Sequence, residues 1–124
     1  MTLRQAHADF SWVVIVANAL VGLWAVGAHY DSRLRSPRLW QATAVAEVTI
    51  FVQVALGVGL VAGQGYEVAQ FHAFYGFVAI IAVGIVYSYR QQLAPHLHLL
   101  YGLGGLFLMG LAIRAFTISP VPVP

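Results

Sequence analysis

The sequence contains no cysteine and no lysine, and these two absences exclude several kinds of chemistry. Without cysteine there is no disulfide, no thiolate metal site, no iron–sulfur cluster and no thioether-linked haem. All six basic residues are arginine, so a lysine Schiff base to retinal or pyridoxal phosphate is also excluded. The chain has no run of basic residues, which argues against nucleic-acid binding.

Charge is also scarce. Only 8% of the residues are charged, whereas 60% are apolar. In soluble domains roughly a quarter of the residues are charged. This chain therefore has too few charged residues to cover a water-soluble surface. The composition therefore predicts an integral membrane protein with the lipid bilayer as its surroundings.

Four apolar segments predict an all-α membrane domain. They cover residues 10–28, 39–62, 71–89 and 97–118. Each is about 19–24 residues long, enough to cross a hydrocarbon core of roughly 30 Å. The connections are short, so we expect an up-down-up-down four-helix bundle within a single domain, 1–124. The proline-rich tail, 119–124, is expected to be extended because proline cannot continue a helix.

The arginines predict the orientation. Arg33, Arg35, Arg38 and Arg90 fall in or beside the first and third connections, whereas Arg4 and Arg114 fall toward the other side. Positive loops stay in the cytoplasm, so both termini are expected outside it. We expect a prokaryotic plasma membrane.

The first and third segments resemble each other. The stretch His7–Ala17 matches His72–Ala82 at a constant offset, with His, Ala, Val, Ile and Ala coinciding. This similarity predicts a parallel duplication of a two-helix hairpin.

The repeat places His7 and His72 at equivalent points of diagonal helices, near the outer face. Two histidines that face each other across a bundle are suited to axial ligation of a haem iron. Ser11 and Gly76 lie one turn further in and leave room for a macrocycle. The alternatives are interfacial or structural histidines, another metal, or a proton relay.

A second histidine pair is less regular. His29 and His98 fall toward the cytoplasmic side. They lie on adjacent helices instead of diagonal ones, so they are only a weak candidate for a second haem site. His96 follows Pro95 and is expected to be solvated. Arg114 is expected either to reach lipid headgroups, to pair with Asp9 or Glu67, or to hold a haem propionate.

Glu47 is the one acid well inside a predicted span. A carboxylate at that depth has to be neutral, paired or exposed to water, so Glu47 is a functional candidate. Thr43 shares its face, and Tyr87 and Tyr101 lie at a similar depth. The functional interpretation is a proton relay, and the alternative is a hydrogen-bonded carboxyl that joins helices.

The bundle layout and the His-Ala-x-Phe/Tyr-Ser/Gly pattern at His7 and His72 resemble small b-type cytochromes. The resemblance is to the cytochrome b561 group and to single halves of haem A synthase. It implies bound haem b and electron transfer. The chain lacks the double pair of haem ligands of the first group and the acidic loop of the second.

Two functions follow as hypotheses. The first is a haem b-binding electron-transfer or anchor subunit of a respiratory-type complex. The second is a cofactor-free accessory subunit that packs against other membrane subunits or itself through glycine-rich faces. A third, weaker hypothesis is proton or small-solute transport through Glu47. We expect no stand-alone enzyme.

Overall fold

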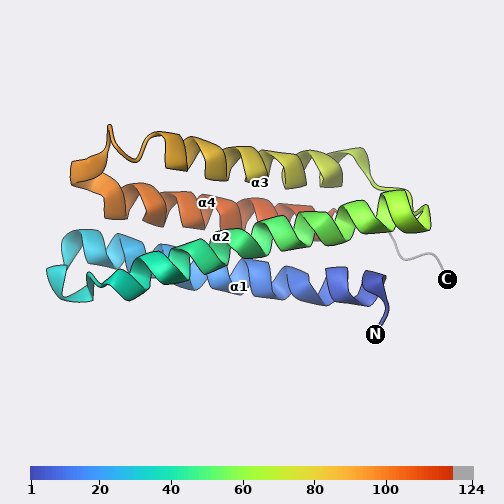
Figure 1. Ribbon diagram of the computed structural model, residues 1–124, viewed down its shortest axis with the longest axis horizontal. Helices are drawn as coiled ribbons and strands as arrows, with labels where there is room; N and C mark the ends of the chain where they lie inside the picture. Colours follow the sequence, from blue (N-terminus) through green and yellow to red (C-terminus); the bar gives the residue numbers. More distant parts are fainter. Residues whose placement is uncertain (119–124) are drawn as a thin grey trace.

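A computed structural model describes residues 1–118 and is helical throughout its regular structure (Figure 1). The four long helices are α1 (Leu3–Tyr30), α2 (Pro37–Val58), α3 (Gln70–Ser88) and α4 (Leu97–Thr117). The short elements are the 3-10 helices η1 (Ser32–Leu34) and η3 (Ala94–His96) and the π-helix η2 (Gly59–Gly63). The expected extended tail, 119–124, lies outside the described residues.

Each of the four long helices is long and apolar enough to cross a membrane, which confirms that part of the sequence prediction. Large apolar side chains cover the outside of the bundle: Leu20 is 63% exposed and Phe71 is 67% exposed. In none of the four helices is more than 28% of the most apolar window buried by the rest of the chain. Most of the apolar surface is therefore left for other apolar surroundings.

Helix α1 begins at Leu3, well before the expected start at Phe10. The Thr2 hydroxyl accepts a hydrogen bond from the Gln5 amide (3.1 Å), and the Gln5 side chain accepts one from the Thr2 amide (2.9 Å). This capping box satisfies amide groups that have no partner inside the helix. It therefore lets the helix begin in a polar segment that the apolar pattern does not cover.

Helix α2 begins as its sequence suggests, with Ser36 as N-cap and Pro37 in the first turn. Its end differs from the expected boundary because residues 59–63 form a π-helical turn. The chain then turns at Gly65, where φ is +71°. Glycine is needed there because a side chain disfavours that backbone conformation.

Consecutive helices run antiparallel, so the ends that carry Leu3 and Thr117 lie at the same end of the bundle (Figure 1). Helix α1 packs against α2 and α4, and α3 packs mainly against α4. The α1–α4 contact is tight: a Cβ on Gly105 would lie 3.1 Å from the Cα of Gly22. Small residues permit this close approach of two backbones.

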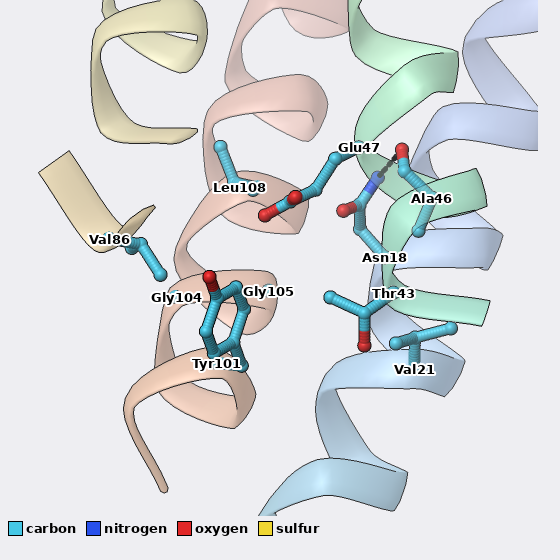
Figure 2. Close-up of a pocket in the computed structure, with 10 residues that line it drawn as sticks. All are labelled: Asn18, Val21, Thr43, Ala46, Glu47, Val86, Tyr101, Gly104, Gly105 and Leu108. Atoms are coloured by element: carbon cyan, nitrogen blue, oxygen red, sulfur yellow. Dashed lines mark hydrogen bonds between the residues drawn. The ribbon is translucent and has the colours of Figure 1, made fainter. Parts of the chain in front are cut away.

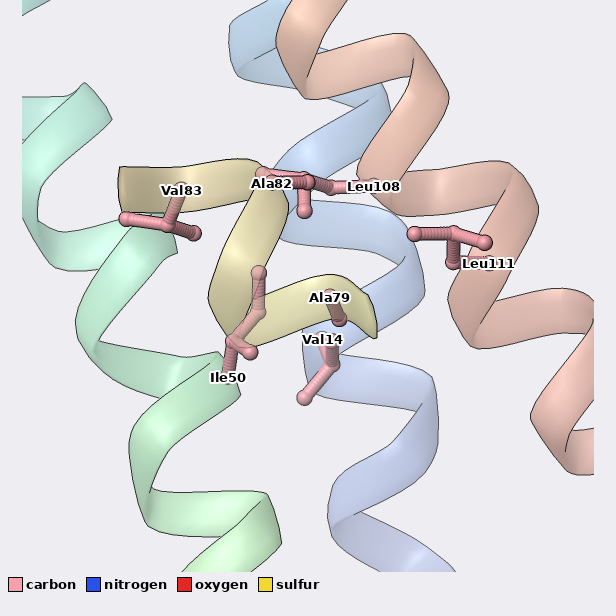
Figure 3. Packing of buried hydrophobic residues seen from close by; sticks show 7 residues of the cluster. All are labelled: Val14, Ile50, Ala79, Ala82, Val83, Leu108 and Leu111. Carbon is pink, nitrogen blue, oxygen red and sulfur yellow. The ribbon is translucent and has the colours of Figure 1, made fainter. Parts of the chain in front are cut away.

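The buried apolar residues form two clusters. The larger one gathers side chains from all four helices in the middle of the bundle (Figure 3). Its members are Val14, Ile50, Ala79, Ala82, Val83, Leu108 and Leu111. The smaller cluster lies near the α1–α2 connection and consists of Ala25, Ala28 and Leu39.

Candidate functional site

The structure brings the rings of His7 and His72 together, although the two residues come from diagonal helices. Their ring centroids are 6.0 Å apart and the planes are inclined by 76°. The capping box places His7 in the second turn of α1, and His72 lies in the first turn of α3. The antiparallel arrangement puts both turns at the same end of the bundle (Figure 1).

The His72 ring is held by the last turns of α4. Its Nδ1 lies 2.8 Å from the carbonyl oxygen of Ala115. A carbonyl only accepts hydrogen bonds, so Nδ1 carries the proton and donates it. In a neutral ring the lone pair is then on Nε2. Metal-binding histidines commonly have this arrangement, with the second ring nitrogen donating to a backbone carbonyl.

The His7 ring lies against α2. A Cβ on Gly57 would be 3.1 Å from His7 Cε1, so glycine at this position permits the close approach. The Gln53 side-chain nitrogen donates to the backbone carbonyl of His7 (2.7 Å). His7 Nδ1 and Gln53 Oε1 are nevertheless buried without a hydrogen-bond partner in the part of the chain that the structure describes. Buried polar atoms of this kind are rare in folded proteins and often mark a functional position.

Ser11 and Gly76, which were expected to flank the histidines, are both small and differ in their surroundings. The Ser11 hydroxyl donates to the carbonyl of Ala8 (2.5 Å). A Cβ on Gly76 would meet its nearest neighbour, Val54, at an ordinary 4.0 Å. A side chain larger than glycine at position 76 would therefore occupy space that the fold leaves open.

Arg114 is exposed near the end of α4, at the same end of the bundle as the histidine pair. Within residues 1–118 it forms no salt bridge with Asp9 or Glu67, so the expected ion pair is not found. Its place at this end leaves the lipid-headgroup and propionate predictions open.

The histidines at the opposite end form a different pair from the expected one. The His29 ring lies 5.7 Å from that of His96, the residue that was expected to be simply solvated. His98 instead stacks near Trp40, at 4.9 Å between ring centroids. His96 is exposed, as expected, but it ends the short helix η3 and approaches α1.

Glu47 lines a small cavity between the helices (Figure 2). Thr43 and Asn18 line the same cavity, and so does Tyr101, whose hydroxyl points toward the carboxyl group in Figure 2. Tyr87, the other expected donor, is 57% exposed and does not line it. Of the two tyrosines expected near Glu47, only Tyr101 therefore lines the cavity, and within residues 1–118 no hydrogen bond joins it to Glu47.

Sequence reasoning missed the groups that hold the histidine rings, namely Gln53, Gly57 and Ala115. An available signal was the sequence His-x-x-Tyr-Gly, which occurs at His72 and again at His98. At each of these two positions the histidine ring meets another aromatic ring.

Comparisons of the chain with known protein families, with curated proteins and with solved structures find no match.

Proposed function

We propose that the protein is an integral membrane four-helix bundle that binds haem b between His7 and His72. It would serve as an electron-transfer or anchor subunit of a respiratory-type complex. The observation that carries the proposal is the pair of imidazoles 6.0 Å apart at one end of the bundle. Two metal–nitrogen bonds of roughly 2 Å, with about 1 Å from each nitrogen to its ring centre, require a separation of roughly 6 Å.

The rest of the donor set also fits haem. The Ala115 carbonyl fixes the tautomer of His72, and the buried Nδ1 of His7 has no hydrogen-bond partner among residues 1–118. Among the described residues there is no group of three or more histidine and acidic side chains that could hold a bare metal ion. Haem needs only two axial ligands from the protein. Bound haem would supply one-electron transfer.

Several features support the membrane part of the proposal. The four helices are long and apolar enough to cross a bilayer, and their outward side chains are apolar. The arginine distribution favours termini outside the cytoplasm of a prokaryotic plasma membrane. The matched stretches at His7 and His72, now at the same end of the bundle, favour a parallel duplication of a helical hairpin.

The direct test is haem binding by the purified protein in detergent or nanodiscs. We expect a Soret band and a six-coordinate low-spin spectrum after haem addition. His7→Ala and His72→Ala should each remove most of the bound haem, because one axial ligand is lost. His96→Ala is the matched control, since His96 is exposed at the other end, and it should bind haem normally.

Gly76→Leu tests the space for the macrocycle separately from the ligands. The open space beside Gly76 lets the apo-protein fold, whereas the larger side chain would compete with the ring. Ser11→Leu should act in the same way. A folded wild-type protein that takes up no haem, or haem binding at the wild-type level by both His7→Ala and His72→Ala, would refute the proposal.

A cofactor-free accessory subunit is the second candidate, and the outward glycines favour it. A Cβ on Gly84 of α3 or Gly110 of α4 would meet nothing within 4 Å. Exposed small residues on apolar helices are suited to contact with another membrane helix. If this candidate is correct, Gly84→Leu and Gly110→Leu should weaken co-purification of a partner subunit while haem is absent from the wild-type complex.

A further inference from the structure

The cavity at Glu47 is polar on one side and is the size of a single small molecule. Its volume is about 10 Å³, close to the minimum that holds one water. The polar side chains that line it are Asn18, Thr43, Glu47 and Tyr101. Figure 2 shows the Glu47 carboxyl group and the Tyr101 hydroxyl turned toward each other across this space.

Two of these polar side chains already donate hydrogen bonds to backbone carbonyls. The Asn18 side-chain nitrogen donates to the carbonyls of Val14 (2.9 Å) and Ala46 (3.3 Å), and the Thr43 hydroxyl donates to that of Leu39 (2.8 Å). The Asn18 nitrogen is thereby directed away, and its oxygen faces the cavity in Figure 2. Glu47 has no hydrogen bond or salt bridge to any described residue. One water in the cavity would give the carboxyl group the partner that it lacks.

The titratable and charged groups near the cavity are few. Tyr101 lines it from α4, and Arg90 and Tyr87 at the end of α3 act electrostatically on Tyr101. The Arg90 guanidinium lies over the Tyr87 ring (3.7 Å) and donates to the Tyr87 carbonyl (2.8 Å), so it is directed to its own helix end. No arginine lines the cavity. A half-buried carboxyl group without a cationic partner is favoured in its neutral, protonated form.

Aromatic and histidine side chains lie between the cavity and the end of the bundle that carries η1 and η3. The ring centroid of Trp40 lies 5.4 Å from that of Tyr101 and 4.9 Å from that of His98. His98 interacts electrostatically with His29, which lies 5.7 Å from the exposed ring of His96. Toward the other end, the larger apolar cluster follows directly, since Val14 and Ile50 lie about one turn beyond Asn18 and Ala46.

From this arrangement we propose that Glu47 is an internal proton-binding site that is loaded from one side of the bundle only. The carboxyl group holds a proton and one water joins it to Tyr101 and Asn18. Protons reach it by way of Tyr101 and the histidines at the end that carries η1 and η3. The larger apolar cluster closes the other side. This site is separate from the His7–His72 pair and requires no haem.

Infrared spectroscopy of the protein in nanodiscs tests the proton on Glu47. The chain has only four acids. Asp9 and Glu67 are exposed to solvent, and Arg33 holds the pKa of the Asp31 carboxyl below its usual range. We expect one carboxylic-acid C=O band at pH 7 that disappears in Glu47→Gln and remains in Glu67→Gln.

Hydrogen–deuterium exchange of the same band tests the entry side. Tyr101→Phe should shift the band to higher frequency, since the water loses a partner, and should slow its exchange several-fold. Tyr75→Phe is the matched control because Tyr75 packs against the apolar cluster on the closed side, and its exchange should match the wild type. Absence of the band in folded wild-type protein, or equal exchange in Tyr101→Phe and Tyr75→Phe, would overturn the proposal.

Discussion

His7 and His72 are positioned by helices that do not carry them. Ala115 of α4 accepts a hydrogen bond from the His72 ring, and Gln53 of α2 donates one to the backbone of His7. Two single hydrogen bonds, one between α3 and α4 and one between α1 and α2, therefore join neighbouring helices at this end of the bundle. Such bonds matter more in an apolar interior, where water does not replace a lost partner.

Gln53→Leu tests this link at the residue scale. The substitution removes the hydrogen bond to the His7 carbonyl and should lower the free energy of unfolding by about 0.5–1.5 kcal/mol. Thermal or denaturant unfolding in detergent, followed by circular dichroism, measures the change. Gln41→Leu is the control, since Gln41 is exposed on the same helix. An equal loss of unfolding free energy in Gln53→Leu and Gln41→Leu would show that the hydrogen bond from Gln53 does not stabilise the fold.

At the scale of whole helices, the contact between α1 and α4 is the closest in the bundle. A Cβ on Gly102 would lie 2.5 Å from Val26 Cγ2 and 2.6 Å from the backbone nitrogen of Val26. The second of these is a backbone atom, so a rotamer change cannot relieve the clash. Glycine at position 102 therefore sets how near the two helices approach.

Gly102→Ala should force α1 and α4 apart and destabilise the fold by about 1–3 kcal/mol, the usual cost of overpacking. Gly110→Ala is the matched control on the same helix, because a Cβ there meets nothing within 4 Å. It should leave stability unchanged or raise it by up to about 1 kcal/mol through helix propensity. Unfolding of both variants in the same detergent gives the comparison. A Gly102→Ala protein as stable as Gly110→Ala would contradict the close contact.

At the scale of the whole molecule, charge is distributed unevenly between the two ends. Arg33, Arg35 and Arg38 lie in or beside the α1–α2 connection, and Arg90 follows α3 at the same end. Arg35 is fixed there by hydrogen bonds to the carbonyls of Ala28 (2.7 Å) and His29 (3.0 Å). This end is the more positive one and is also the proposed entry side for protons.

We predict that this positive end faces the cytoplasm and that both termini face away from it. A C-terminal fusion to a reporter that is active only in the cytoplasm should be silent, and a reporter active only outside should give signal. A fusion after residue 90 is the internal control and should give the opposite result. Cytoplasmic activity of the C-terminal fusion would reverse the orientation without altering the helices.

The amino-acid sequence by itself determined the helices and their order. Apolar runs bounded by polar segments specify where helices of membrane-spanning length occur, and short connections make neighbouring helices antiparallel. These signals are local, so they can be read along the chain. Even the early start of α1 depends on local chemistry, since the capping box is formed by Thr2 and Gln5. The apolar pattern does not indicate this start, because the cap is made by polar side chains outside the apolar segment.

Tertiary structure alone decided which side chains meet. The sequence suggested His7 with His72 through the internal repeat, but it paired His29 with His98, whereas the rings that approach are His29 and His96. It also gave no sign that Gln53 and Ala115 contact the histidine pair. Such contacts depend on the rotation and spacing of packed helices. Those are set by close approaches such as that of Gly102 to Val26, between residues far apart in the chain.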